Sequence, residues 1–113
     1  IPMTTADELT PMMLDLIFKD FEADEEIDAL KEGDEIIFFV NSLGATTQME
    51  CLIALRKAKQ LLNDKGIKVR QTMLGPLVTC QEMAGISFSI TKLDDELAKY
   101  WVMPCESLCY TKL

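Results

Sequence analysis

The amino-acid sequence predicts an α/β fold, with a small sheet of about three or four strands built on one βαβ unit and helices packed on it. Residues 36–40 are five consecutive apolar residues, three of them β-branched, which is typical of a strand covered on both faces. Apolar residues recur at helical spacing over 49–62, and apolar and polar residues alternate over 67–73. Strand, helix and strand within about forty residues form a βαβ unit, so we expect its two strands to be parallel.

The first expected helix covers Asp7 to Asp20. Five apolar residues recur there at helical spacing and should face the core: Leu9, Met12, Met13, Leu16 and Ile17. Pro11 leaves two ways for the helix to start. In the first, Thr10 caps the helix and Pro11 takes the first helical position. In the second, Thr5 and Glu8 form a capping box and the proline lies in the second turn.

Residues 22–34 form an acidic connector. Between Glu22 and Glu35, eight of fourteen residues are acidic and one is lysine, which predicts a hydrated segment. The sequence contains no internal repeat and no low-complexity tract, so we expect residues 1–113 to form a single domain. Because the chain opens with Ile1 and Pro2 rather than methionine, we expect it to be a fragment or a processed chain.

The turn that follows the first strand is the candidate ligand site. The polar run from Asn41 to Gly44 interrupts the apolar strand, and Thr47 and Glu50 have the spacing of a capping box. Backbone N–H groups at such a helix start can face an anion or a polar ligand. The turn would be formed by Asn41, Gly44, Ala45, Thr46 and Thr47. Most turns of this kind only connect a strand to its helix, and that alternative stays open.

The remaining elements follow from their patterns. The second helix should end at Lys65 and Gly66 and bury Met49, Leu52, Leu55, Ala58 and Leu62. In the next strand Ile67, Val69, Gln71 and Met73 alternate with three polar residues, Lys68, Arg70 and Thr72, so we expect it to be half buried or near an edge of the sheet. A third strand over 86–91 alternates apolar residues with serine and threonine, and Asp94 can cap a last helix from Asp95 to Trp101.

Composition excludes several classes of function. The chain has nineteen acidic and eleven basic residues, and a net charge of −8 repels nucleic acid and anionic membranes. No apolar run is long enough to span a membrane and no signal peptide is recognisable, so we expect a cytoplasmic protein. The four cysteines form no Cys-x-x-Cys pair and histidine is absent, so we expect no metal site and no cofactor in this chain. Without histidine, Ser–His and Cys–His catalysis are excluded, and no catalytic residue is assigned.

Two ordered motifs, Val-Asn-Ser-Leu-Gly-Ala-Thr at residues 40–46 and Glu-Met-Ala-Gly at residues 82–85, carry a family pattern. Together they resemble the substrate-binding subunit of the dihydroxyacetone (glycerone) kinase family. Residues 40–46, Val-Asn-Ser-Leu-Gly-Ala-Thr, are similar to the Val-Asn-Gly-Leu-Gly-Ala-Thr segment of that family. Residues 82–85, Glu-Met-Ala-Gly, with Ser87 and the Lys-Leu-Asp-Asp-Glu run at 92–96, resemble a second family segment at matching spacing. Gly75, Thr79 and Pro104 fall in register as well. The sequence departs from the family pattern at Ser42, Thr47, Pro76 and Ile86 and after Pro104.

The resemblance implies that the chain corresponds to the carboxyl-terminal third of that subunit, which serves dihydroxyacetone phosphorylation in glycerol catabolism. The family holds its substrate through a histidine, and that histidine has no matching position here. The implied partners are the remainder of the subunit, a second copy in a homodimer, and the domain or subunit that delivers the phosphoryl group from ATP or from a phosphotransferase-system carrier. Two alternatives are a non-catalytic co-activator paralogue that senses dihydroxyacetone, and a structural dimerisation module. We predict that the isolated chain is inactive.

Overall fold

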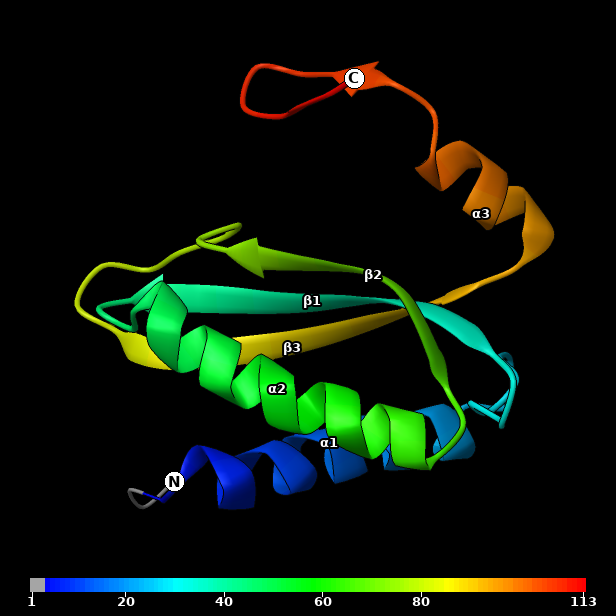
Figure 1. Cartoon of the computed structure of the whole chain (residues 1–113), viewed down its shortest axis with the longest axis horizontal. Coiled ribbons are helices and arrows are strands. Elements are labelled where there is room, and N and C mark those ends of the chain that lie inside the picture. The colour runs from blue at the N-terminus through cyan, green and yellow to red at the C-terminus, as the bar shows by residue number, and fades with distance from the viewer. Residues whose placement is uncertain (1–3) are drawn as a thin grey trace.

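The computed structural model describes residues 4–113, so Ile1 and Pro2, which prompted the expectation of a fragment, lie outside the described residues. Helices α1 and α2 run together along one face of a three-stranded sheet, whereas α3 and a small hairpin form a separate lobe at the carboxyl end (Figure 1). The elements in chain order are α1 (Ala6–Ala23), β1 (Glu35–Gly44), α2 (Gln48–Asp64), β2 (Lys68–Gly75), β3 (Ala84–Leu93), α3 (Asp95–Trp101), β4 (Cys105–Glu106) and β5 (Thr111–Lys112). The predicted α/β class is confirmed.

The sheet has the strand order β2-β1-β3. The β1 and β2 strands are parallel, which confirms the predicted βαβ unit with α2 as its crossover helix. The β3 strand pairs with β1 in the antiparallel sense along the full length of both strands, from Glu35 opposite Leu93 to Gly44 opposite Ala84. The long central strand is therefore hydrogen-bonded on both sides, and it fixes the position of every other element in the sheet.

The core lies between the sheet and the two long helices. Alternate residues of β1, Ile36, Phe38 and Val40, are fully buried and point towards the helices. Phe38 also contacts Phe88 of β3, with the ring centroids 5.2 Å apart. The buried cluster is completed by Leu14 from α1, three residues of α2 and the residue before β2: Cys51, Ala58, Leu62 and Ile67. Each large apolar side chain buried in this way contributes about 1.5–3 kcal/mol.

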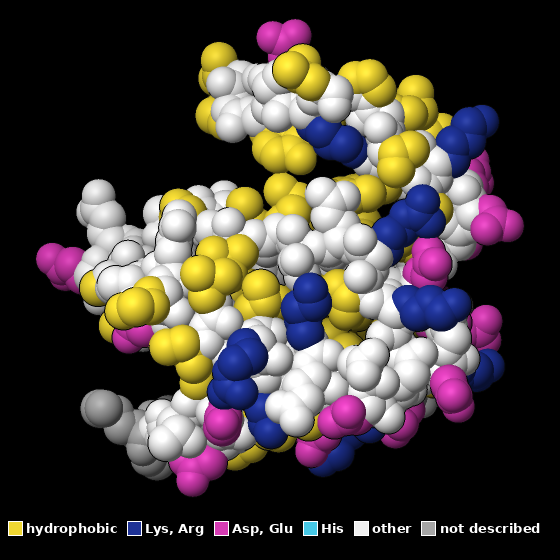
Figure 2. Space-filling view, in the orientation of Figure 1, with side chains coloured by type: hydrophobic (Ala, Val, Ile, Leu, Met, Phe, Trp, Pro, Cys, Tyr) yellow, Lys and Arg dark blue, Asp and Glu magenta, His cyan; other side chains and the backbone are white. Residues whose placement is uncertain are grey.

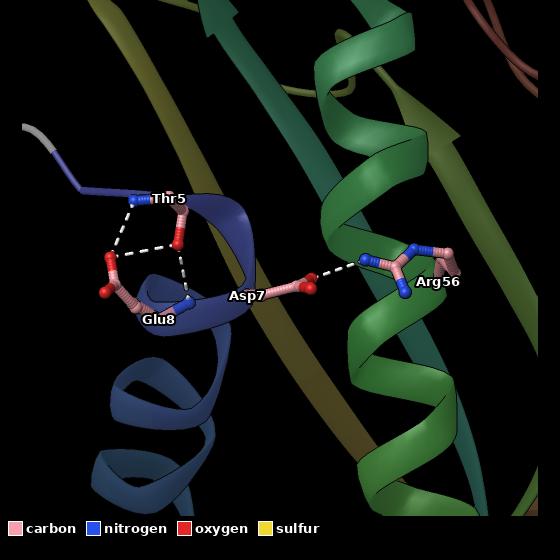
Figure 3. Close-up of polar contacts among 4 residues, drawn as sticks. All are labelled: Thr5, Asp7, Glu8 and Arg56. Atoms are coloured by element: carbon pink, nitrogen blue, oxygen red, sulfur yellow. Dashed lines mark hydrogen bonds and ion pairs between the residues drawn. The ribbon is translucent and has the colours of Figure 1, made fainter.

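The first helix starts at the earlier of its two predicted positions. Thr5 is the N-cap, its hydroxyl accepts a hydrogen bond from the Glu8 N–H at 3.3 Å, and the Glu8 carboxylate accepts one from the Thr5 N–H at 3.1 Å. Figure 3 shows this capping box beside an ion pair between Asp7 and Arg56, which ties the first turn of α1 to α2. Pro11 lies inside the helix, so the local capping chemistry outweighs the backbone hydrogen bond that the proline removes.

The predicted buried faces of both long helices are partly wrong. In α1 the buried residues are Thr10 and Leu14, whereas Met12 and Leu16 are exposed, Leu16 by 68%. In α2 the buried residues include Cys51 and Ala54, whereas Met49 and Leu52 are exposed, Met49 by 69%. Small residues are buried because α1 and α2 pack against each other as well as against the sheet, and close helix packing leaves little room at the contact. The larger apolar residues lie on the flanks of that contact.

The alternation predicted for the second strand fails at one residue. The register runs from Ile36 opposite Val69 directly to Ile37 opposite Gln71, so Arg70 is an extra residue in β2. After this bulge Leu74 is the β2 residue that packs against the core, whereas Gln71 and Met73 do not. Gln71 lies on the opposite face, where its Oε1 accepts a hydrogen bond from the indole N–H of Trp101 at 2.5 Å.

The carboxyl-terminal lobe is held to the sheet through Trp101 at the end of α3. Asp94 caps this helix as predicted, accepting a hydrogen bond from the Leu97 N–H at 2.7 Å. The Trp101 ring contacts the Phe39 ring edge to face with the centroids 6.0 Å apart, and Lys112 of β5 lies 5.2 Å from the Trp101 ring. The β4–β5 hairpin had no counterpart in the sequence prediction, because its strands are too short to show periodicity.

Candidate functional site

The candidate turn begins later than predicted, because β1 continues to Gly44 and the turn proper covers residues 45–47. Asn41 is therefore a strand residue and not part of the turn. The expected break at 41–44 was wrong, since β3 starts at Ala84 and supplies a pairing partner for each of these residues. Tertiary pairing thus overrides the weak strand propensity of Asn, Ser and Gly.

Asn41 holds the loop that leaves β2. Its side-chain Oδ1 accepts hydrogen bonds from the N–H groups of Leu77 and Val78, at 2.8 and 3.0 Å. Its Nδ2 donates to the Val78 carbonyl at 2.6 Å and to the Ser87 hydroxyl at 3.3 Å. One amide side chain therefore fixes the loop after β2 against β1 and β3. All of its polar atoms are used inside the protein, which gives Asn41 a positioning role.

Gly44 brings the two sequence motifs into direct contact. Its backbone has a φ of 60°, and a Cβ on this residue would lie 2.0 Å from the Met83 carbonyl oxygen. The neighbouring Ala45 N–H donates to the same Met83 carbonyl at 2.7 Å. Glu82, just before it, is the only residue other than glycine with a positive φ within residues 4–113, at 54°. The segments at 40–46 and 82–85 therefore form one junction at the end of the sheet, which sequence spacing alone did not reveal.

The backbone N–H groups of the turn already have partners inside the protein. The Gly44 N–H donates to the Thr79 hydroxyl at 2.9 Å, and the Thr46 N–H donates to the Leu43 carbonyl at 3.4 Å. The Thr47 N–H donates to the Glu50 carboxylate at 2.8 Å. Anion binding here stays a prediction, and an anion would have to replace these hydrogen bonds beside the negative charge of Glu50. Of the predicted site residues, Asn41 and Gly44 are in β1 and Ala45, Thr46 and Thr47 form the turn between β1 and α2.

Hydrogen bonds from Thr47 lower the pKa of the Glu50 carboxyl in the first turn of α2. The N–H and hydroxyl of Thr47 both donate to Glu50 and lower the pKa of its carboxyl below the ordinary value of 4.5. Burial raises the pKa of the adjacent Cys51 thiol, and the Glu50 charge adds to that effect. Cys51 is therefore a thiol at neutral pH and a poor nucleophile. The carboxylate of Glu50 serves the helix cap.

Glu50 should make the stability of the fold depend on pH. Because its pKa is lower in the folded chain than in the unfolded chain, the stabilisation is present above pH 4.5 and is lost as the pH falls through the folded value. We expect Glu50→Gln to be less stable than the parent at pH 7 and the difference to shrink at pH 3. Urea unfolding at both pH values measures it, with Glu25→Gln in the connector as the control. An unchanged difference at pH 3 would contradict the assignment.

A hollow opens between the starts of α1, α2 and β3. It has a volume of about 500 Å³, and its lining includes Thr46 from the turn, Glu50 and Ile53 from α2, Leu9 from α1 and Ile86 from β3. This lining is mainly apolar, and its polar side chains are the Glu50 carboxylate and the hydroxyls of Thr4 and Thr46. It offers a surface on which another part of a protein could pack, and it provides no complete active site.

Several other site types have no support in residues 4–113. In this range no three Cys, Asp or Glu side chains gather closely enough to hold a metal ion. The acidic run at 94–96 is used at the start of α3, where Asp94 is the cap. All four cysteines are unpaired: Cys51 is buried, and Cys80, Cys105 and Cys109 are exposed. None of the helices in this range combines the length and apolarity that a membrane crossing demands.

Comparison with known proteins identifies the family of this chain. Residues 1–109 match the Dak1 domain. The chain is 33% identical to an L-erythrulose kinase from Pectobacterium atrosepticum over 99% of its own length and 18% of that protein. It is 40% identical to the dihydroxyacetone-binding subunit DhaK of a PTS-dependent dihydroxyacetone kinase from Listeria innocua, over 59% of this chain and 20% of the subunit. The chain therefore spans about a fifth of the length of these curated relatives.

The fold has a counterpart among solved structures. A structure described as concerning regulation of the dha operon of Lactococcus lactis superimposes with a TM-score of 0.74 at 22% identity. The superposition covers 90% of this chain and 30% of the other, and it supports the fold alone. The two motifs that meet at Gly44 are those on which the resemblance to dihydroxyacetone kinases rests, and the family match covers both of them. On the sequence match and the shared fold together, this chain belongs to the Dak1 domain family.

Proposed function

We propose that this chain acts as the carboxyl-terminal part of a dihydroxyacetone kinase substrate-binding subunit. In that role it supplies a sheet, two packed helices and a structured loop junction to an active site completed by other residues. The observation that supports the proposal most is the similarity to a ketose kinase that runs through 99% of this chain yet covers only 18% of the relative. The names of the relatives include dihydroxyacetone and erythrulose kinases, so the substrate class is a short ketose.

The catalytic groups would come from outside this chain. The resemblance implies a histidine that captures the substrate carbonyl as a hemiaminal, and this sequence contains no histidine. The Thr47 hydroxyl that donates to the Glu50 carboxylate belongs to the capping box of α2, and the Cys51 thiol beside it is buried. The role proposed for these residues is therefore to pack against and position the segment that carries the reacting groups.

The open reading frame that contains this chain gives the first test. If the proposal is right, the frame encodes additional residues before Ile1, and they include the histidine-bearing segment of the family. The protein encoded by the whole frame should then gain the mass of dihydroxyacetone on incubation. A frame that ends without such a segment would contradict the proposal.

The isolated chain should form no adduct with either ketose. The chain has no imidazole and Cys51 is buried, and addition of the exposed thiols of Cys80, Cys105 and Cys109 to a ketone is reversible and is lost on dilution. We expect intact-mass spectrometry to show the unmodified mass after incubation with dihydroxyacetone or L-erythrulose and dilution, and we expect no kinase activity. A histidine-containing relative serves as the positive control. An adduct that survives dilution would refute the prediction.

A co-activator paralogue that senses dihydroxyacetone is the alternative proposal. The sequence observation that favours it is the departure from the family motif at Ser42, Thr47, Pro76 and Ile86. The two proposals differ in the protein from the whole frame: a paralogue captures the ketone without passing it on for phosphorylation, whereas a kinase subunit does both. A phosphoryl-transfer assay with ATP or with a phosphorylated carrier protein separates them.

Homodimer formation belongs to the same proposal. Apolar residues are exposed on the flanks of both long helices, among them Met12, Leu16, Met49 and Leu52, and exposed apolar surface favours association. A purely structural dimerisation module would use this surface alone. Size-exclusion chromatography with light scattering decides the point, since a strictly monomeric and folded chain would remove the dimerisation module from consideration.

A further inference from the structure

The basic residues of this acidic chain are concentrated in one region. Six of the eleven Lys and Arg residues lie between positions 56 and 70, where Asp64 is the one acidic residue. The other eighteen acidic residues and five basic residues are distributed over the rest of the chain. Dark-blue side chains accordingly lie over α2 in the middle of the face in Figure 2. Arg56 and Arg70 are ion-paired with Asp7 and Glu35. The positive surface of the α2–β2 region is therefore made by lysines that form no ion pair within residues 4–113: Lys57, Lys59, Lys65 and Lys68.

The same region contains an open sheet edge. The β2 strand is terminal in the order β2-β1-β3, and within residues 4–113 no strand pairs with its outer side. Its first residues, Lys68 and Arg70, are exposed. An edge strand leaves backbone N–H and C=O groups able to pair with another extended segment.

A hollow with a basic rim lies beside the start of this edge. It has a volume of about 380 Å³ and is lined by the end of α2 and the start of β2, with Lys59, Asn63 and Lys68 as its polar side chains and no carboxylate. Neither Lys59 nor Lys68 forms an ion pair with any residue in the described range 4–113. A carboxylate that entered this hollow would meet two ammonium groups and one amide.

We propose that β2 and this hollow bind an extended acidic segment of another protein. The segment adds as a strand to the outer edge of β2, and one of its carboxylates occupies the hollow between Lys59 and Lys68. Backbone hydrogen bonds along the edge supply much of the affinity, and the basic side chains select an acidic sequence. This inference concerns a surface of the described residues and goes beyond the kinase role proposed above.

The charge distribution favours an acidic peptide over other occupants. A second copy pairing through the same edge would bring two basic surfaces together, which is unfavourable. A nucleic acid carries no backbone donors that match a strand edge, and the eighteen acidic residues elsewhere on the chain repel a long polyanion. A short acidic strand satisfies both the edge and the hollow.

The test uses a seven-residue peptide of alternating valine and glutamate, with blocked ends, titrated into the isotopically labelled chain. We expect saturable shifts of backbone amides in residues 67–71 and of the Lys59 and Lys68 side chains, weakening as salt is raised from low to high concentration. The same peptide N-methylated at alternate residues keeps its charge and loses strand pairing, so it should not bind. Equal binding of the methylated peptide would overturn the proposal.

The double variant Lys59→Gln with Lys68→Gln should weaken peptide binding about fivefold while keeping the spectrum of the folded chain. The matched control, Lys19→Gln with Lys99→Gln, changes the net charge equally and should bind like the parent. The proposal fails if the titration leaves the β2 amides unmoved, or if both double variants bind alike. It also fails if light scattering shows that the same edge forms a dimer, or if an oligouridylate gives stronger shifts at these residues.

Discussion

The variant Gly44→Ala should lose about 3 kcal/mol of unfolding free energy, or fail to fold. Two costs add at this position. A residue with a Cβ pays about 1 kcal/mol to adopt the φ of 60°. The new Cβ would also lie 2.0 Å from the Met83 carbonyl oxygen and 2.9 Å from the Cys80 carbonyl oxygen, so the loop before β3 must move. That movement would break the hydrogen bond from the Ala45 N–H to Met83.

Gly33→Ala is the matched control for this prediction. Gly33 has a φ of 92°, and a Cβ there would meet nothing within 4 Å. The substitution Gly33→Ala therefore costs only the free energy of placing a residue with a Cβ at a positive φ, which we expect to be about 1 kcal/mol. Urea denaturation followed by circular dichroism measures both variants. If the two glycines proved equally sensitive, the close approach of the 82–85 segment to β1 would not matter for stability.

Asn41→Ala should lower the unfolding free energy by about 2 kcal/mol and release the loop that follows β2. The substitution removes the acceptor for the Leu77 and Val78 N–H groups and the donor to the Val78 carbonyl. Each such hydrogen bond contributes about 0.5–1.5 kcal/mol, and water can replace part of it because Leu77 and Val78 are exposed. The amides of these two residues should exchange with solvent roughly tenfold faster than in the parent, corresponding to about 1.4 kcal/mol of local stability.

Two further variants separate the Asn41 hydrogen bonds from general effects. Asn63→Ala, on the exposed end of α2, removes an asparagine that makes no side-chain hydrogen bond within residues 4–113, so it should be close to neutral. Ser87→Ala removes only the 3.3 Å contact to Asn41 and should have a small effect. Unchanged exchange at Leu77 and Val78 in Asn41→Ala would show that the loop is held by other contacts.

The helix starts were predictable because they depend on neighbouring residues. Thr47 and Glu50 form their capping box in the structure, and so do Thr5 and Glu8, which decides between the two starts weighed for the first helix. Asp94 caps the last helix in the same way. Each of these caps joins residues three positions apart, so their chemistry can be recognised in a short window of sequence.

Burial was less predictable where an element contacts more than one neighbour. The apolar spacing of α1 and α2 correctly identified helices, yet Met12, Leu16, Met49 and Leu52 are exposed and Thr10, Cys51 and Ala54 are buried. Periodicity gives the direction of an apolar stripe to within about one residue per turn, and the contact between the two helices selects the small residues beside it. The extra residue Arg70 in β2 likewise depends on pairing with β1.

In the candidate site, too, the sequence identified residues whose contacts only the structure shows. Its residues were found from the sequence, because Asn41, Gly44 and Thr47 mark a strand end and a helix start. Their actual partners, Val78, Thr79 and Met83, lie more than thirty residues away, and no local pattern connects them. The sequence therefore indicated where the turn lies, whereas the structure shows that the N–H groups of Gly44 and Ala45 hold the loop before β3.

The sequence by itself determined the α/β class, the order of the helices and of the three strands of the main sheet, the helix caps and the motifs that mark the Dak1 family, since all of these depend on residues close together in the chain. Only the tertiary structure decided the length of β1, the buried faces of the helices, the bulge in β2 and the junction at Gly44. The physical reason is that pairing and packing between distant segments contribute more free energy than the local preferences of one or two residues.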